Sequence, residues 1–300
     1  MLRYGFMQSA LVAGVLVGVM APTVGVHLVQ RRMSIIGDGI GHVALSGVAL
    51  GVVAGWAPTG TAMAVAVAGA VGMELLRGLR RSEADVLLAI LFAGGIAGGV
   101  VVLSWAPAGG SMNLDAYLFG AILTTTRTDL LVLSGTVAAV LAVTVGWRRA
   151  LFAVSVDEEC ARAAGLPVVP LNLLFAATTA ATVVASMRIL GLLLVSALMV
   201  LPAAAAMAMA RSFRGTLVAA VAIGAVVAVV GTTAAYYAGL PAGGAIVLLA
   251  VVLFAGASGA PGAHLILRRL LARGNAAVGR GRPAVGPARP GIRSQVSLLL

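Results

Sequence analysis

Long apolar segments alternate with short connections that carry the charged residues along almost the whole chain. Each apolar segment is about 18 to 24 residues long, the length that a helix needs to cross a hydrocarbon core roughly 30 Å thick. We therefore predict an all-α polytopic membrane protein with eight to nine transmembrane helices. The nine predicted helices lie at about residues 6–29, 40–56, 59–77, 86–106, 129–147, 171–187, 189–209, 215–237 and 244–267.

The composition agrees with this prediction. Hydrophobic residues make up 61% of the 300 residues, charged residues only 10%, and the mean hydropathy is +1.10. A soluble domain needs more polar side chains to cover its surface. The first apolar segment, which begins at Phe6, is too long for the core of a signal peptide, so we interpret it as a retained span.

The chain is strongly basic, with 20 arginines, no lysine and 9 acidic residues. The arginines lie in short connections with few aromatic neighbours, which favours membrane orientation over binding of nucleic acid. Placing the N-terminus outside puts 17 of the 20 arginines on the inner side and leaves Arg3, Arg127 and Arg188 outside. We therefore predict a multi-pass protein of the cell inner (plasma) membrane with a cytoplasmic C-terminus.

The longest inner connection, residues 148–170, reads RRALFAVSVDEECARAAGLPVVP. Its acidic residues Asp157, Glu158 and Glu159 are expected in the first turn of a short helix that ends at Gly165, because acidic side chains favour helix N-termini and glycine favours their ends.

Two other regions differ from the spans. In the outer connection 107–128, the apolar part 114–123 is too short to cross a membrane, and we expect a short re-entrant or interfacial helix there. Residues 274–300 are rich in Gly, Pro and Arg, and we interpret them as a disordered basic cytoplasmic tail after a permease domain of residues 1–273.

Charged and titratable groups inside spans are costly and point to function. Asp38 and His42 lie four residues apart at the start of the second span, so on a helix they share one face. A carboxylate and an imidazole suit Zn²⁺, Mn²⁺ or Fe²⁺, and two ligands hold such an ion weakly, as a conduit requires. The alternative is a buried Asp–His hydrogen bond that only fastens two helices.

The remaining candidates favour structural roles. His27 could be a third ligand but is expected to be structural, and His264 is expected at the membrane interface. Glu74 lies one turn before Arg77, which predicts an interfacial salt bridge. The single cysteine, Cys160, has no partner for a disulfide within the chain.

Several enzyme motifs are missing from the sequence. It contains no G-x-x-x-x-G-K-[ST] loop, no H-E-x-x-H and no G-x-S-x-G. We therefore expect no enzyme activity and no ATPase site within this chain.

Five ordered segments resemble the metal-specific permeases of ABC importers, which carry zinc, manganese or iron. They read RRMSIIGDGIGHVALSGVALG, LDAYLFGAIL, VDEECARAAGLP, MRILGLLLVSALMVLPAAAAMAMARSF and YYAGLPAGGAIVLLAVVLF. The resemblance implies a permease homodimer or pseudo-dimer, two cytoplasmic ABC ATPase subunits and an extracytoplasmic metal-binding solute-binding protein. It implies no permanent cofactor, because the divalent metal ion is the cargo.

The resemblance also assigns roles to residues. It implies that Asp38 and His42 are metal ligands of the pathway. It implies that the inner connection holds the coupling helix, whose ATPase-facing residues are Asp157, Glu159, Arg162 and Gly165. The sequence departs from the common family pattern at Gly41, where serine is frequent, and at Ser46, where proline is frequent, and loss of that proline is expected to straighten the span.

Three alternatives remain open at this stage. A permease for a chelated metal or vitamin-like ligand would need a wide, neutral vestibule. A proton-coupled secondary cation carrier would use Asp38 as its proton site. A membrane scaffold would use Asp38 and His42 for stability alone.

Overall fold

The computed structural model describes residues 5–79, 84–105, 117–118, 120 and 122–258. Within these ranges the chain is helical and contains no strand, which confirms the all-α part of the predicted fold class.

Seven helices are long and apolar enough to cross a membrane. They are α1 (Gly5–Gln30), α2 (Ile36–Ala54), α3 (Pro58–Leu79), α4 (Ala84–Ser104), α6 (Arg127–Gly146), α9 (Val168–Leu190) and α11 (Phe213–Ala238). Two shorter apolar helices, α10 (Leu192–Met209) and Ala242–Ser258, lie in the other two predicted segments. The short elements between them are η2 (Ile122–Thr124), α7 (Arg148–Val156) and α8 (Glu158–Ala163).

Local sequence signals explain where several helices begin. Thr126 and Asp129 form a reciprocal capping box at the start of α6, which satisfies backbone N–H groups that a helix N-terminus leaves free. Helix α2 begins at Ile36, four residues earlier than predicted, and Asp38 lies in its first turn. A carboxylate is favoured there because the helix dipole is positive at its N-terminus.

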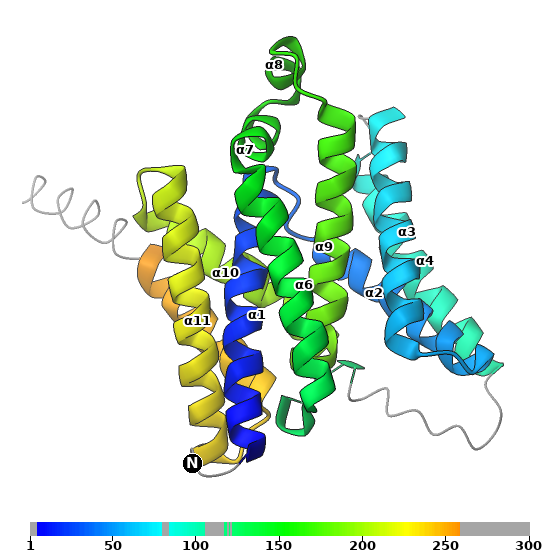
Figure 1. The fold of residues 1–300 in the computed structure, drawn as a ribbon, viewed down its shortest axis with the longest axis vertical. Coiled ribbons are helices and arrows are strands. Elements are labelled where there is room, and N and C mark those ends of the chain that lie inside the picture. The colour runs from blue at the N-terminus through cyan, green and yellow to red at the C-terminus, as the bar shows by residue number, and fades with distance from the viewer. Residues whose placement is uncertain (1–4, 80–83, 106–116, 119, 121, 259–300) are drawn as a thin grey trace, which may run out of the picture. The chain divides into compact units, whose positions relative to one another are not determined.

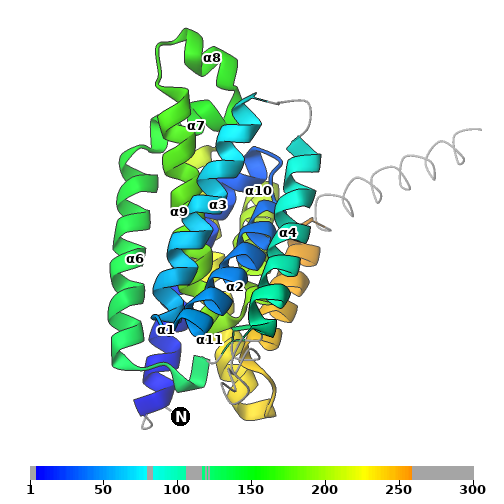
Figure 2. The same ribbon diagram turned by 90° about the vertical axis from the view of Figure 1, so that its right-hand side faces the viewer.

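The described helices pack as two groups. Helix α1 packs mainly on α10 and α11, whereas α2 packs mainly on α3 and α4. Helix α9 contacts α1 of the first group and α3 of the second (Figures 1 and 2). Small residues permit the closest approaches: a Cβ at Gly18 would lie only 2.6 Å from the backbone oxygen of Gly224, so these two helices meet backbone to backbone.

Some predictions fall largely on residues that the structure does not describe. Of the predicted short outer helix, it describes two helical residues, Tyr117 and Leu118, and then η2. The basic tail 274–300, the last part of the permease domain and His264 lie outside the described residues.

Candidate metal pathway and coupling site

Asp38 and His42 lie on one face of α2, one turn apart, and both are half-buried. Within the described residues, no hydrogen bond or ion pair joins them, and the Nδ1 atom of His42 is buried without a hydrogen-bond partner. A buried polar atom of this kind usually has a partner in a folded protein, so an unpaired one calls for an explanation.

Helices α2 and α4 are in close contact at His42. The His42 ring packs edge-on against Phe92, with 4.5 Å between ring centroids. A Cβ at Gly95 would lie 2.8 Å from the backbone carbon of His42 and 2.7 Å from the nitrogen of Val43. Glycine at position 95 therefore lets α4 approach the backbone of α2 at the histidine.

The two positions that depart from the family pattern also make contacts. A Cβ at Gly41 would meet the end of the Leu192 side chain, so glycine lets α2 approach α10. The Ser46 hydroxyl donates to the backbone oxygens of Gly95 and His42. Helix α2 continues past Ser46 to Ala54 without interruption.

The inner connection forms a short helix in the predicted place. Asp157 caps α8, accepting hydrogen bonds from the backbone N–H groups of Glu159 (2.9 Å) and Cys160 (3.0 Å). These bonds lower the pKa of Asp157. Its carboxylate in turn raises the pKa of the Cys160 thiol, first through a hydrogen bond and then through its charge. Gly165, two residues past α8, has φ 79, a left-handed conformation that favours glycine.

The four residues to which the family resemblance assigns ATPase contact all lie exposed on this connection, namely Asp157, Glu159, Arg162 and Gly165. Glu158, which the sequence analysis did not select, is half-buried and takes part in interactions with α3 and α9.

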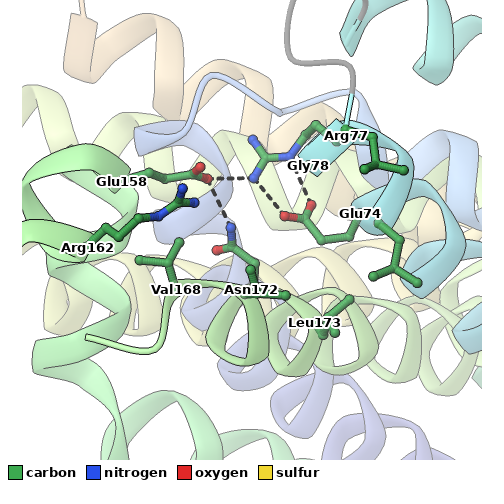
Figure 3. Close-up of a pocket in the computed structure, with 11 residues that line it drawn as sticks. Glu74, Arg77, Gly78, Glu158, Arg162, Val168, Asn172 and Leu173 are labelled. Atoms are coloured by element: carbon green, nitrogen blue, oxygen red, sulfur yellow. Dashed lines mark hydrogen bonds and ion pairs between the residues drawn. The ribbon is translucent and has the colours of Figure 1, made fainter. Parts of the chain in front are cut away.

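Glu158 belongs to a set of linked polar side chains that we call the Arg77 cluster: Arg31, Glu74, Arg77, Glu158 and Asn172. The Arg77 guanidinium donates to Glu74 (2.7 and 3.0 Å) and to Glu158 (2.6 Å), and the Asn172 amide donates to the same Glu158 oxygen (3.0 Å; Figure 3). Arg31 donates to the amide oxygen of Asn172 at 2.9 Å. The predicted Glu74–Arg77 salt bridge is thus confirmed.

The charges in this cluster stabilise each other. Burial alone would raise the pKa of Glu158, but hydrogen bonds and charge from Arg77, helped by Asn172 and Arg31, outweigh it and lower the pKa. Burial lowers the pKa of Arg31 to about 10, which leaves the side chain charged at neutral pH. Arg31 also lies over the Phe175 ring, 4.7 Å from its centroid.

A cavity of about 690 Å³ lies beside the Arg77 cluster. Its walls come from the end of α3, from α8 and from the start of α9, and they include Leu75, Leu79, Arg162, Val169 and Leu173. Side chains therefore do not fill the space between the end of α3 and the inner connection.

His27 lies fully buried in α1, and its Nε2, like the Nδ1 of His42, has no hydrogen-bond partner within the described residues. Its ring packs against Phe175 and Phe213, and its Nδ1 is 3.2 Å from the backbone oxygen of Thr23. Within the described residues, no group of three or more His, Cys, Asp or Glu side chains is placed to hold a metal.

Comparison with known proteins gives a consistent result. Residues 3–260 match the model of the family described as the ABC 3 transport family. The chain is 33% identical over 255 residues to a probable metal transport system membrane protein of Treponema pallidum, an alignment that covers 84% of this chain and 94% of the relative.

Two further relatives add detail. The manganese transport system membrane protein MntC of Listeria innocua is 29% identical over 254 residues, which cover 85% of this chain and 90% of MntC. The solved structure of PsaBC from Streptococcus pneumoniae in complex with Fab matches with a TM-score of 0.76 and 30% identity, over 85% of this chain and 92% of that one.

Proposed function

This chain belongs to the ABC 3 transport family, and we propose that it is the membrane-spanning permease subunit of an ABC importer for divalent transition-metal ions. In this proposal the chain forms the translocation pathway, and ATP hydrolysis on a separate subunit drives transport. The observation that carries the proposal is the pair Asp38 and His42, one turn apart on α2, with the buried Nδ1 of His42 unpaired within the described residues.

The chemistry of this pair suits a metal in transit. Asp38 supplies negative charge and His42 supplies a nitrogen ligand that favours transition metals over Ca²⁺ or Mg²⁺. Two ligands from one chain bind an ion loosely enough to release it. If the pair only fastened helices, a hydrogen bond between them or to a neighbouring helix would be expected, and neither is seen within the described residues.

We further propose nine spans in the cell inner membrane, with the N-terminus outside and the C-terminus in the cytoplasm. Contacts between arginine-bearing helix ends support this topology. Arg31, after α1, donates to Ser155 of α7, and Arg77, near the end of α3, donates to Glu158 of α8. These ends meet at one end of the helix bundle (Figures 1 and 2), as connections on the positively charged cytoplasmic side should.

We propose the partners from the family to which the chain belongs. The exposed residues Asp157, Glu159, Arg162 and Gly165 of the α8 connection would receive the ATPase subunit, and a solute-binding protein would deliver metal at the opposite end. A second copy of the chain would complete the pathway as a homodimer and add a second Asp38–His42 pair. The transported Mn²⁺, Fe²⁺ or Zn²⁺ is cargo, and the proposal needs no permanent cofactor.

The test is ATP-dependent uptake of radiolabelled manganese, iron(II) and zinc by proteoliposomes that hold this chain with its ATPase and solute-binding protein. Asp38→Asn and His42→Ala should each reduce uptake more than about tenfold, because even indirect partners of a metal change affinity by roughly 10- to 100-fold. Leu50→Ala, at an exposed position of the same helix, is the matched control.

Manganese comes first among the three ions because the Listeria relative is named for it. Wild-type uptake of none of the ions would contradict the importer. Normal uptake by both variants, with unchanged yield and thermal stability, would show that the pair does not bind the cargo.

A further inference from the structure

The Arg77 cluster joins segments that are far apart in the sequence. Arg77 and Glu158 are separated by 81 positions, and Arg31 and Asn172 by 141. Through these bonds α8 is linked to α3, and the start of α9 is linked to the connection between α1 and α2. The cluster is thus a junction between the inner connection and the helices of the bundle.

The ion pairs at this junction are partly buried. The side chains of Glu74, Arg77 and Glu158 are only 10%, 18% and 23% exposed. Partly buried charges are screened less than surface charges, and removing one partner leaves the other poorly solvated. The Glu158–Arg77 contact is therefore expected to hold while α8 moves.

Among the described residues, the cluster pairs two arginines with two glutamates. The cavity beside it separates α3 from the inner connection. Figure 3 shows the Arg77 side chain of α3 reaching Glu158 at the edge of this space. Because packed side chains do not fill the gap, the ion pair is a direct link by which a displacement of α8 can reach α3, beside the packing of α3 on α9.

A second link leads toward the metal pair. Arg31 donates to Ser155 of α7 at 3.0 Å as well as to Asn172 of α9. Arg31 directly precedes the tight corner into α2, where the Met33 N–H donates to the Leu28 oxygen. Asp38 follows only seven residues after Arg31. Because Arg31 is bonded to α7 and α9, a shift of either helix would move the chain close to the proposed ligands.

We propose that Glu158 and Arg77, together with Asn172 and Arg31, are positioning residues that transmit the ATPase-driven displacement of α8 to α3 and to the start of α2. The proposal rests on the proposed function and assigns its coupling to named bonds. Loss of the Glu158–Arg77 pair should lower the amount of metal imported per ATP hydrolysed. If the pair is purely structural, its loss would leave this ratio unchanged.

The experiment measures metal imported per ATP hydrolysed in the reconstituted complex. Glu158→Gln removes one charge with little change of volume, and Arg77→Gln removes the opposite charge and also shortens the side chain. The double variant Glu158→Arg with Arg77→Glu restores opposite charges in reversed order. Arg211→Gln, at an exposed arginine remote in sequence from the cluster, is the control for loss of a cytoplasmic arginine.

Both single variants should hydrolyse ATP but import roughly two- to thirtyfold less metal per ATP, which corresponds to a coupling free energy of about 0.5–2 kcal/mol. The double variant should recover the wild-type ratio. Single variants with the same ratio as Arg211→Gln, or a double variant no better than they are, would overturn the proposal. If the single variants fail to assemble, the ratio of the assembled double variant decides.

The two proposals fail in different ways. Absence of ATP-dependent uptake by the wild type would overturn the importer function and the coupling assignment together. Normal wild-type uptake with unaffected single variants would overturn only the coupling assignment.

Discussion

The contact between Gly95 and the backbone at His42 leads to a quantitative prediction. A methyl group at position 95 would lie 2.7 to 3.1 Å from the nearest atoms of Val43 and His42. Unstrained carbon contacts are about 3.5–4.0 Å, so Gly95→Ala must push α4 away from α2 by roughly 0.7 Å at this point. The nearest obstacles are backbone atoms, which cannot rotate out of the way.

The neighbouring Gly94 offers a matched control. A Cβ at position 94 would meet nothing within 4 Å. Both substitutions gain about 0.5–1 kcal/mol from the better helix propensity of alanine. Only Gly95→Ala adds an overpacking cost of about 1–3 kcal/mol. The difference between the two variants therefore isolates the contact at His42.

The assay is thermal unfolding of the two variants purified in detergent, combined with metal uptake in proteoliposomes. At about 2–4 °C per kcal/mol for a chain of this size class, Gly95→Ala should unfold about 2–12 °C below Gly94→Ala. Uptake should fall only in Gly95→Ala, because the displaced backbone carries His42. Equal unfolding temperatures would refute the close approach of the two helices.

Three further predictions concern the connections. Arg32 is exposed and has φ 58, a left-handed conformation that costs a residue with a Cβ roughly 1–2 kcal/mol. Arg32→Gly should therefore raise the thermal unfolding temperature. An unchanged unfolding temperature would contradict backbone strain at this position. Asp157 raises the pKa of the Cys160 thiol, so Asp157→Asn should lower this pKa and increase the fraction of thiolate at pH 8. Because the thiolate is the form that reacts, maleimide should label this sole cysteine faster in the variant. An unchanged labelling rate would show that Asp157 does not affect the thiol pKa. The pKa of Glu158 is lower in the folded state than its usual value of 4.5. Its ion pair with Arg77 therefore contributes its full stabilisation at any pH above 4.5. This contribution is lost as the pH falls through the pKa of Glu158 in the folded state. The difference in unfolding temperature between wild type and Glu158→Gln should therefore shrink below about pH 4.5, and a difference constant from pH 3 to 7 would contradict this account.

The helices could be predicted from the sequence because each follows from local hydrophobicity. Helix α9, predicted at 171–187, runs from Val168 to Leu190, and each of the nine predicted segments overlaps a helix of the described structure. The boundaries were less predictable, since capping and tertiary contacts decide them. Helix α2 extends to Ile36 and so includes Asp38 in its first turn rather than before the helix.

Local polar contacts were also predictable, and distant ones were not. The Glu74–Arg77 salt bridge spans three positions of one helix and follows from helical spacing. The bonds from Arg77 to Glu158 and from Arg31 to Asn172 depend on how the helices pack, which hydropathy does not encode. One signal could have shown that Glu158 has a different role from Asp157 and Glu159. On a helix, consecutive residues point about 100° apart, so three acidic residues in a row cannot all face the same partner.

The contacts within each packed group of helices differ in kind from the contacts between the two groups. Within each group, glycines place backbone against backbone, as where Gly25 meets the oxygen of Met199 and Gly95 meets His42. Between the groups, α2 faces α10 through side chains: Gly37 faces the Ser196 hydroxyl, and Gly41 faces the end of Leu192. Side chains can change rotamer. Backbones in direct contact have no such freedom, so the helices that carry them move together. At the contact of α2 with α10, a shear motion would meet side chains that can change rotamer, and it would alter the surroundings of Asp38 and His42 on α2.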